Sequence, residues 1–143
     1  MFTIYVGMAL KGAPEEFRTD FQRELKSKLR KVNNVEVLDF FWEAKGRNPE
    51  DNIEVYLWDK ERTENADLCV FVADHASTGM GQEFEIRMQT GKSAAAFVHA
   101  TNDSVSNMFL GACEVHKVPV VRYRSVDDIV AYVASYILVK ENK

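Results

Sequence analysis

The sequence is poor in cysteine, proline and glycine. Its 143 residues include two cysteines, three prolines and seven glycines. Two cysteines are too few for a disulfide framework, and we expect Cys69 and Cys113 to be reduced thiols in or near the core. The chain has 46% hydrophobic and 28% charged residues and no repeat, linker or low-complexity stretch, which excludes a disordered or fibrous protein. This length predicts one globular domain over residues 1–143.

Long hydrophobic runs and an excess of positive charge are also missing. No apolar run approaches the roughly 20 residues that a membrane-spanning helix needs. The segment 1–6 has no basic stretch ahead of it, so it does not indicate a signal peptide. Eighteen lysines and arginines against 22 acids give a net charge of −4, whereas nucleic-acid-binding surfaces are basic. We therefore expect a cytoplasmic protein that binds neither a membrane nor a nucleic-acid polymer.

Ligand sets for a metal ion are not evident in the sequence. His75, His99 and His116 lie far apart, and none is paired on one helix face at the spacing of a zinc site. We expect no metal and no cofactor.

The chain alternates short β-type runs with amphipathic helical stretches. Five strands are predicted, at residues 2–7, 35–40, 68–73, 94–99 and 119–123. Five helices are predicted, one after Pro14 and the others at about residues 52–65, 81–90, 105–115 and 127–138. In the first helix an apolar stripe consists of Phe17, Phe21, Leu25 and Leu29. Its polar face, which carries Lys26, is expected to be solvated.

Apolar strands joined by helical crossovers predict a parallel sheet that is covered on both faces. Right-handed crossovers then favour an α/β fold of three layers, a doubly wound five-stranded parallel sheet of the Rossmann or flavodoxin type. Such sheets bind ligands at the carboxyl ends of their strands. The loops expected to matter most are therefore 8–13, 41–48 and 74–81.

The third of these loops carries two glycines with hydroxyl groups before them. It reads STGMGQE over residues 77–83. Glycines let backbone N–H groups approach an anion, and the start of a helix adds partial positive charge. The loop lacks a third glycine and follows the third strand, so a dinucleotide-binding fingerprint is disfavoured.

Glu83 lies in the first turn of the helix that follows this loop. A carboxylate there can attack or stabilise an electron-deficient sugar carbon. The alternative is an (i, i+4) ion pair with Arg87 and a favourable charge at the start of the helix.

Residues 77–83, with ADLCVFV at residues 66–72, resemble the nucleoside 2-deoxyribosyltransferase superfamily, which includes the 2′-deoxynucleoside 5′-phosphate N-hydrolases. Ile4 and Tyr5 resemble the N-terminal Ile-Tyr of this family. Asp59, eight residues before Asp67, stands where the family has an acid that serves the nucleobase. SNMFLGA at residues 106–112 is similar to a segment that the hydrolase branch uses across its dimer interface. The resemblance covers nearly the whole chain in order.

The resemblance implies catalytic roles for three residues. Glu83 is the nucleophile that attacks the anomeric carbon, and Tyr5 holds it by a hydrogen bond. Asp59 helps to transfer a proton to the departing base, which requires a carboxyl with a raised pKa. Without the resemblance, Asp59 is a surface acid of a helix and Tyr5 a core aromatic.

The resemblance also implies how the 5′ end of the sugar is bound. Family members that take free nucleosides have an acid where this chain has Ser77, and serine donates to a phosphate without charge conflict. Lys11 and Ser106 match phosphate-binding positions of the hydrolase branch, although an ordinary surface lysine remains the alternative for Lys11. Met8 and Ala9 depart from the Gly and Ser of the hydrolases, which removes a hydroxyl donor. The other candidate substrate-binding residues at this end are Gly7, Gly79, Gly81 and Met108.

Aromatic residues follow the second strand. Phe41 and Trp42 can stack on a nucleobase, and the alternative is a place at the edge of the core or in a dimer contact. The resemblance further implies a homodimer or a dimer of dimers in which Ser106 reaches the neighbouring pocket.

Three functions are open at this point. The first is an N-glycosidase that cleaves (2′-deoxy)ribonucleoside 5′-monophosphates through a covalent glycosyl-Glu83 intermediate. The second is a nucleoside 2-deoxyribosyltransferase that passes the same intermediate to another base. The third is a catalytically silent nucleotide-binding module.

Overall fold

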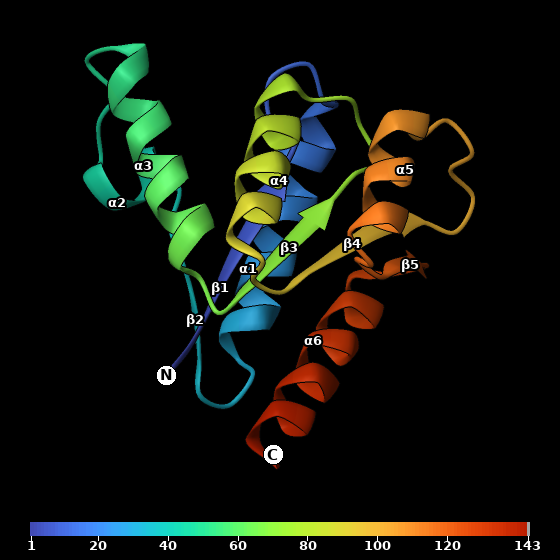
Figure 1. The fold of residues 1–143 in the computed structure, drawn as a ribbon. Helices are drawn as coiled ribbons and strands as arrows, with labels where there is room; N and C mark the ends of the chain where they lie inside the picture. The colour runs from blue at the N-terminus through green and yellow to red at the C-terminus, as the bar shows by residue number, and fades with distance from the viewer. Residues whose placement is uncertain (143) are drawn as a thin grey trace.

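A computed structural model describes residues 1–142 of the chain. The five strands form one all-parallel sheet in the order β2-β1-β3-β4-β5 (Figure 1). Their bounds are β1 (Phe2–Met8), β2 (Val35–Val37), β3 (Leu68–Val72), β4 (Ala94–His99) and β5 (Val120–Tyr123). The predicted α/β fold of Rossmann type is confirmed.

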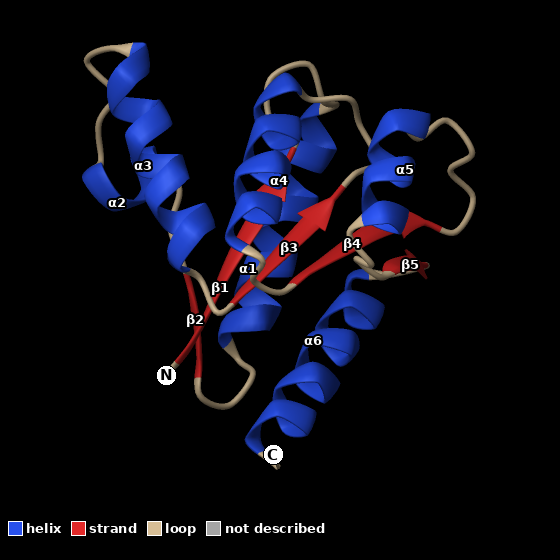
Figure 2. Ribbon diagram, viewed as in Figure 1, coloured by secondary structure: helices blue, strands red, loops and turns tan. Residues whose placement is uncertain are grey.

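Helices cover both faces of the sheet (Figure 2). Their bounds are η1 (Phe17–Phe21), α1 (Gln22–Arg30), α2 (Phe41–Lys45), α3 (Asn52–Asn65), α4 (Thr78–Thr90), α5 (Asn107–Val115) and α6 (Val126–Glu141). On one face α1 packs against α6, and on the other α3 packs against α4. Within residues 1–142, no helix combines the length and apolarity needed to cross a membrane.

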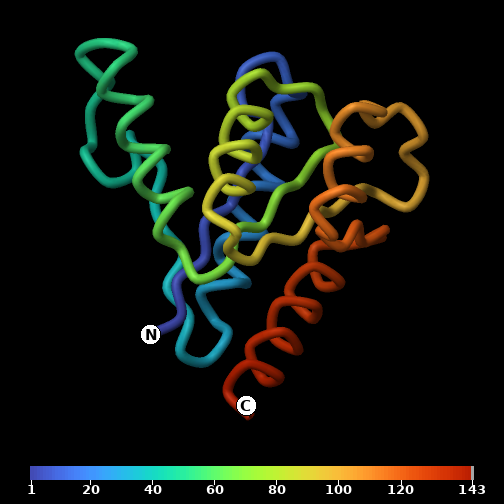
Figure 3. The backbone as a smooth tube through the Cα atoms, in the orientation of Figure 1, coloured from blue at the N-terminus to red at the C-terminus, as the bar shows by residue number. Residues whose placement is uncertain are grey.

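The centre of the sheet explains why its strands are continuously apolar. Every residue of β3 is buried, and so are the last five residues of β1, because helices cover them on both sides. Cys69 and Cys113 are buried free thiols, as expected. The connections that follow β1 and β3 lie at the end of the molecule opposite both chain termini (Figure 3).

Two predicted element boundaries near the site are wrong by three residues each. The second strand ends at Val37 rather than at residue 40, because Phe41–Lys45 turn into the short helix α2. The helix predicted at residues 81–90 is α4, and it begins at Thr78, which places Glu83 beyond the first turn and not in it. Ser77 accepts a hydrogen bond from the Met80 N–H at 3.1 Å and so starts the helix earlier.

The expectation that the polar face of the first helix is solvated is wrong for Lys26. This side chain is 1% exposed. Its Nζ bonds Glu43 Oε1 at 2.6 Å and lies 3.3 Å from the centre of the Phe40 ring. The unpredicted helix α2 carries Glu43 and thereby covers a lysine that helix periodicity alone assigns to solvent.

Candidate active site

Three acidic or phenolic side chains from distant parts of the chain meet beside the sheet. Tyr5, in the middle of β1, is 1% exposed, and its hydroxyl donates to Glu83 Oε2 on α4. Asp59 reaches the same place from α3, where its charge raises the pKa of both Tyr5 and Glu83. The structure thus brings together the three residues that were predicted as catalytic.

Burial changes the acidity of both carboxyl groups. It raises the pKa of Glu83 from 4.5 to about 8, with the Tyr5 hydrogen bond acting in the opposite direction and the charge of Asp59 adding to the rise. Burial likewise raises the pKa of Asp59 from 3.8 to about 6, opposed by Arg62, the Tyr5 hydroxyl and Lys26. Both carboxyls therefore change charge near neutral pH.

The Tyr5 hydroxyl keeps its proton over the same pH range. Burial, followed by the charges of Glu83 and Asp59, raises its pKa well above the ordinary value of 10.0. Tyr5 is therefore a constant hydrogen-bond donor to Glu83 and favours the ionised form of that carboxylate.

A buried cation and an aromatic ring support this cluster from the side of β2. The Phe40 ring packs edge-on against Tyr5 with centroids 6.4 Å apart. Lys26 lies over that ring and is fixed by Glu43, which also accepts the Phe40 N–H at 2.8 Å. Sequence analysis did not predict that Lys26 supports the site. The one feature of the sequence that could have indicated its burial is its position next to the buried Leu25.

The structure separates the two predicted aromatic ligands of the base. Phe41 is 2% exposed and packs edge-on against Trp58, with centroids 5.6 Å apart, so it belongs to the core. Trp42 is 49% exposed, and the centroids of its ring and the Phe40 ring are 5.2 Å apart. Of the two, Trp42 is the side chain that a molecule bound near Tyr5 can contact.

The start of α4 has open backbone next to a hydroxyl. The Ser77 oxygen accepts the Met80 N–H and can still donate its own proton. Gly79 and Gly81 are exposed, and a Cβ at either would meet no atom closer than 4.0 Å. Neither has a positive φ. Packing and backbone strain therefore do not require glycine here, and the space stays open at the helix N-terminus.

Gly7 and Lys11 have different surroundings. Gly7 is buried in β1, where a Cβ would lie 2.7 Å from the Phe71 ring, so close packing requires glycine at this position. Lys11 is exposed in the loop after β1 and forms no ion pair with any residue between 1 and 142. Because β1 and β3 are parallel neighbours, the loop with Lys11 and the loop with Ser77 leave the same edge of the sheet.

A groove of about 830 Å³ lies between α4 and α5. Ser77, Gly81, Ser106 and Met108 line it, whereas none of its described lining residues belongs to the cluster of Tyr5, Asp59 and Glu83. Ser106 caps α5 by accepting the Phe109 N–H at 3.3 Å, and Met108 is 89% exposed. One chain therefore places Ser106 and Met108 on a different side of α4 from Glu83.

The alternative role of Glu83, an ion pair with Arg87, is not observed among the described residues. Arg87, one turn further along α4, instead donates to the backbone carbonyls of Thr63, Ala66 and Ser93. Glu83 has Tyr5 as its hydrogen-bond donor. Within residues 1–142, no group of three or more His, Cys, Asp or Glu side chains is arranged to hold a metal ion.

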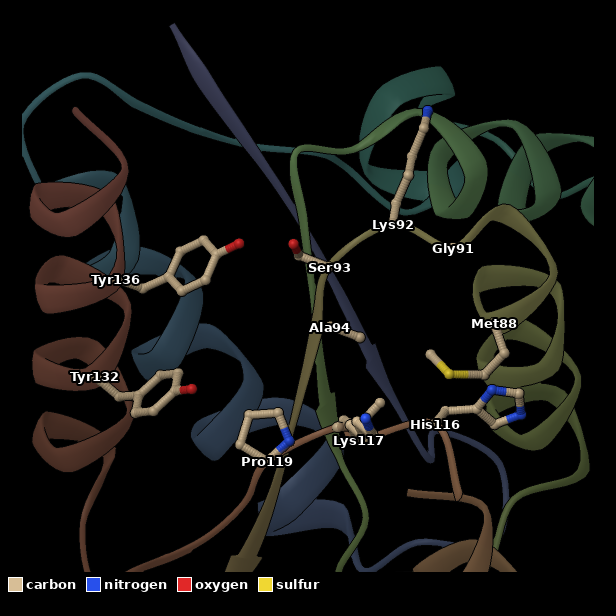
Figure 4. Close-up of a pocket in the computed structure, with 11 residues that line it drawn as sticks. Met88, Gly91, Lys92, Ser93, Ala94, His116, Lys117, Pro119, Tyr132 and Tyr136 are labelled. Carbon is tan, nitrogen blue, oxygen red and sulfur yellow. The ribbon is translucent and has the colours of Figure 1, made fainter. Parts of the chain in front are cut away.

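A second cavity lies at the other end of the strands (Figure 4). It has a volume of about 300 Å³ and lies beside the start of β4, between the rings of Tyr132 and Tyr136 on α6 and the side chains of Met88 and His116. Parallel α/β sheets bind ligands at the carboxyl ends of their strands. Glu83 lies in the first half of α4, which begins beyond the carboxyl end of β3, so the cluster around Glu83 is the stronger candidate active site.

Comparisons with known proteins bear on the fold. No protein-family model matches the sequence, and no curated protein matches it either. A solved structure of the CMP N-glycosidase BcmB from Clostridium botulinum is similar over 94% of this chain and 98% of its own, with a TM-score of 0.69 and 15% identity.

Two further solved structures are similar. A conserved protein from Enterococcus faecalis V583 matches over 92% of this chain and 96% of its own, with a TM-score of 0.71 and 16% identity. CapF, solved with the inhibitor 3-isopropenyl-tropolone, matches over 86% of this chain and 30% of its own, with a TM-score of 0.53 and 15% identity. At these identities the likeness shows that the chain shares their α/β Rossmann-like fold.

Proposed function

We propose that this protein is a nucleotide N-glycosidase, which cleaves the bond between base and sugar in a (2′-deoxy)ribonucleoside 5′-monophosphate. The observation that carries the proposal is the half-buried carboxyl of Glu83, held by the Tyr5 hydroxyl beside the second carboxyl of Asp59. A neighbour in fold that is named a CMP N-glycosidase supports this choice. Residues 1–143 then form a single nucleoside deoxyribosyltransferase-like domain.

The reaction proceeds in two displacements at the anomeric carbon. A carboxylate oxygen of Glu83 forms a bond to that carbon while the glycosidic C–N bond breaks and its electron pair moves to the base. Asp59 gives its proton to the base. Water then attacks the same carbon, its proton passes to Asp59, and the electron pair of the ester bond returns to Glu83.

The raised pKa values mean that the two carboxyls share a proton near neutral pH. Between about pH 6 and about pH 8 the pair of carboxyls holds one proton, shared between Glu83 and Asp59. Because Glu83 has the higher pKa of the two, the proton rests mainly on Glu83, and the working form, with the proton on Asp59 and the charge on Glu83, is the minor one. The hydrogen bond from Tyr5 stabilises that form because it favours ionised Glu83.

The 5′-phosphate is bound at the start of α4. Ser77 keeps a hydroxyl proton to donate, and the exposed backbone of Gly79 offers an N–H group in the first turn of α4, whereas the Gly81 N–H donates to Ser77 O at 3.1 Å. Lys11 adds a positive charge from the neighbouring loop. Together these donors favour a substrate with a phosphate over a free nucleoside.

The base stacks on the exposed ring of Trp42, next to Phe40 and Tyr5. The site is completed by a second copy of the chain in a homodimer or a dimer of dimers. Ser106 and Met108 lie away from Glu83 of their own chain and close the pocket of the neighbouring one.

A base-exchange reaction is the second candidate, favoured by one feature. Met8 and Ala9 after β1 provide no hydroxyl donor for a phosphate. A nucleoside 2-deoxyribosyltransferase uses the same covalent intermediate and passes it to a second base in place of water.

One screen separates the candidates. The protein is incubated with the common ribo- and deoxyribonucleosides and their 5′-monophosphates, with and without a second free base, and the products are separated by chromatography. Base release from monophosphates without added base supports the N-glycosidase. A new nucleoside that forms only with the second base supports exchange. Binding without any released base supports the silent module and contradicts the proposal.

A further inference from the structure

Arg87 has no role in the reaction outlined above, yet its side chain is fully buried. Its Nη1 donates to Ala66 O at 2.8 Å and to Thr63 O at 3.0 Å, and its Nε and Nη2 donate to Ser93 O at 3.0 and 2.8 Å. Within residues 1–142 no carboxylate oxygen lies within 4.0 Å of the guanidinium. A buried charge without a counter-charge is costly unless strong dipoles compensate it.

The dipoles come from the end of α3. Thr63 belongs to the last turn of that helix and Ala66 is its C-cap. Carbonyls at a helix C-terminus lack partners within the helix and carry its partial negative charge. The guanidinium therefore caps α3 from inside the protein, and its other edge holds Ser93 at the start of β4.

The contact between Arg87 and Thr63 has the same spacing from the proposed catalytic carboxyl on each of the two helices. Asp59 precedes Thr63 by four residues on α3, and Glu83 precedes Arg87 by four residues on α4. Residues four apart on a helix lie on one face, about one turn from each other. The contact between Arg87 and α3 thus lies one turn below the place where Asp59 and Glu83 meet.

We propose that Arg87 is a positioning residue, which clamps the end of α3 to α4 and so sets the separation between the carboxyls of Asp59 and Glu83. Its effect on turnover rests on the proposed function. Arginine is needed because its planar fork of five donors reaches carbonyls of two segments at once, which the single ammonium group of lysine cannot do.

The environment of Glu83 reports on that separation. The titratable groups that face Glu83 are Tyr5 from β1, Asp59 from α3 and the Cys69 thiol from β3. If the clamp loosens, Glu83 moves away from Asp59 and water enters. Both changes lower the pKa of Glu83, because burial and the charge of Asp59 are what raise it.

The test uses Arg87→Lys and Arg87→Gln, with Lys92→Ala as the matched control. Lys92 is exposed in the loop after α4 and donates to Glu64 O at 2.8 Å, so it contacts the same end of α3 from outside and not from within α4. The Glu83 carboxyl is titrated by ¹³C NMR, and turnover of the best nucleotide is measured. We expect both Arg87 variants to lower the pKa of Glu83 by at least about 0.5. We also expect at least about tenfold loss in kcat with KM within about threefold.

The two readouts separate this proposal from the proposed function. If wild type releases no base but the Arg87 variants still shift the Glu83 titration, the proposed function fails and the positioning role stands. An unchanged titration in folded Arg87 variants overturns the positioning role, whatever the activity. An equal shift in Lys92→Ala, or failure of both Arg87 variants to fold, also overturns it, because Arg87 then serves the stability of the fold alone.

Discussion

Glu83 owes its chemical character to what surrounds it. The same residue type at position 85, two residues on, is exposed and, among residues 1–142, accepts only from Gln89 of its own helix. At position 83 the side chain is turned toward Tyr5 and Asp59, and burial raises the pKa of the carboxyl to about 8. Two positions along α4 thus separate an exposed surface acid from a carboxyl that titrates near neutrality.

This shift makes the free energy of unfolding depend on pH. The folded protein binds the Glu83 proton more tightly than the unfolded chain does, because the pKa rises from 4.5 to about 8 on folding. The stability from this group is present in full below about 4.5 and is lost as the pH rises to about 8. We expect the melting temperature of Glu83→Gln to rise relative to that of wild type as the pH increases from about 5 to about 9.

Thermal unfolding across that range measures the effect, with Glu85→Gln as the control on the exposed side of the same helix. The difference between Glu85→Gln and wild type is expected to stay constant with pH. A constant difference for Glu83→Gln as well would mean that Glu83 is not held in a buried site.

At this scale the sequence predicts part of the site. Tyr5 and Glu83 can be named in advance because each stands in a short motif that resembles a known family, and Asp59 because it lies eight residues before Asp67 of another such motif. Lys26 and Arg87 cannot, since both look like helix-surface cations until α2 covers the first and the end of α3 surrounds the second. Their burial depends on segments far away in the chain, which helix periodicity does not report.

The residues at which the helices begin and end determine where the side chains of the site lie. The Ser77 hydroxyl starts α4 and sets the turn on which Glu83 faces Tyr5. α3 is predicted and observed over the same residues, 52–65, because Asp51 provides a clear cap by accepting the Glu54 N–H. α2 has only five residues and is held by contacts with α1 and α3, such as that of Glu43 with Lys26, so its sequence alone does not indicate a helix.

The start of α4 carries the prediction about substrate choice. A phosphate with nearly two negative charges gains charge-assisted hydrogen bonds from Lys11 and the Ser77 hydroxyl, each contributing about 1.5–3 kcal/mol. We expect kcat/KM to be at least about tenfold higher for 5′-monophosphates than for the matching nucleosides. Lys11→Ala and Ser77→Ala are expected to reduce this ratio, and Ser77→Asp to reverse it by charge repulsion.

Steady-state kinetics on paired substrates measure the ratio. Gln89→Ala, at an exposed position near the other end of α4, serves as the control and is expected to leave the ratio unchanged. Equal rates for nucleosides and monophosphates in wild type would contradict phosphate binding and favour base exchange.

The whole molecule divides its proposed site between two sides of α4. Glu83 meets Tyr5 and Asp59 on the side of α3, while Ser106 and Met108 line the groove toward α5. A parallel sheet covered on both faces follows from the alternation of apolar strands and helices, which is why the fold class can be predicted at this level. The division of the site between the two sides of α4 cannot be predicted from the sequence, because it depends on which way each helix faces.

This division predicts a symmetric dimer in solution. We expect light scattering to give twice the mass of one chain or a multiple of it. Met108→Glu, at an 89% exposed position on α5, is expected to weaken assembly and lower activity together. Leu138→Glu, at a 59% exposed position on α6, is the control and is expected to change neither. A fully active monomer at assay concentration would remove Ser106 from the site.

The most direct test of the central claim compares Glu83 with Glu85 in base release from nucleoside 5′-monophosphates. Glu83→Gln and Glu83→Ala are expected to fold, to bind the nucleotide, and to lose at least about a thousandfold in rate, because the nucleophile is gone. Glu85→Ala is expected to keep the rate of wild type. Near-normal base release by the Glu83 variants, or an equal loss in Glu85→Ala, would contradict the assignment of Glu83 as the nucleophile.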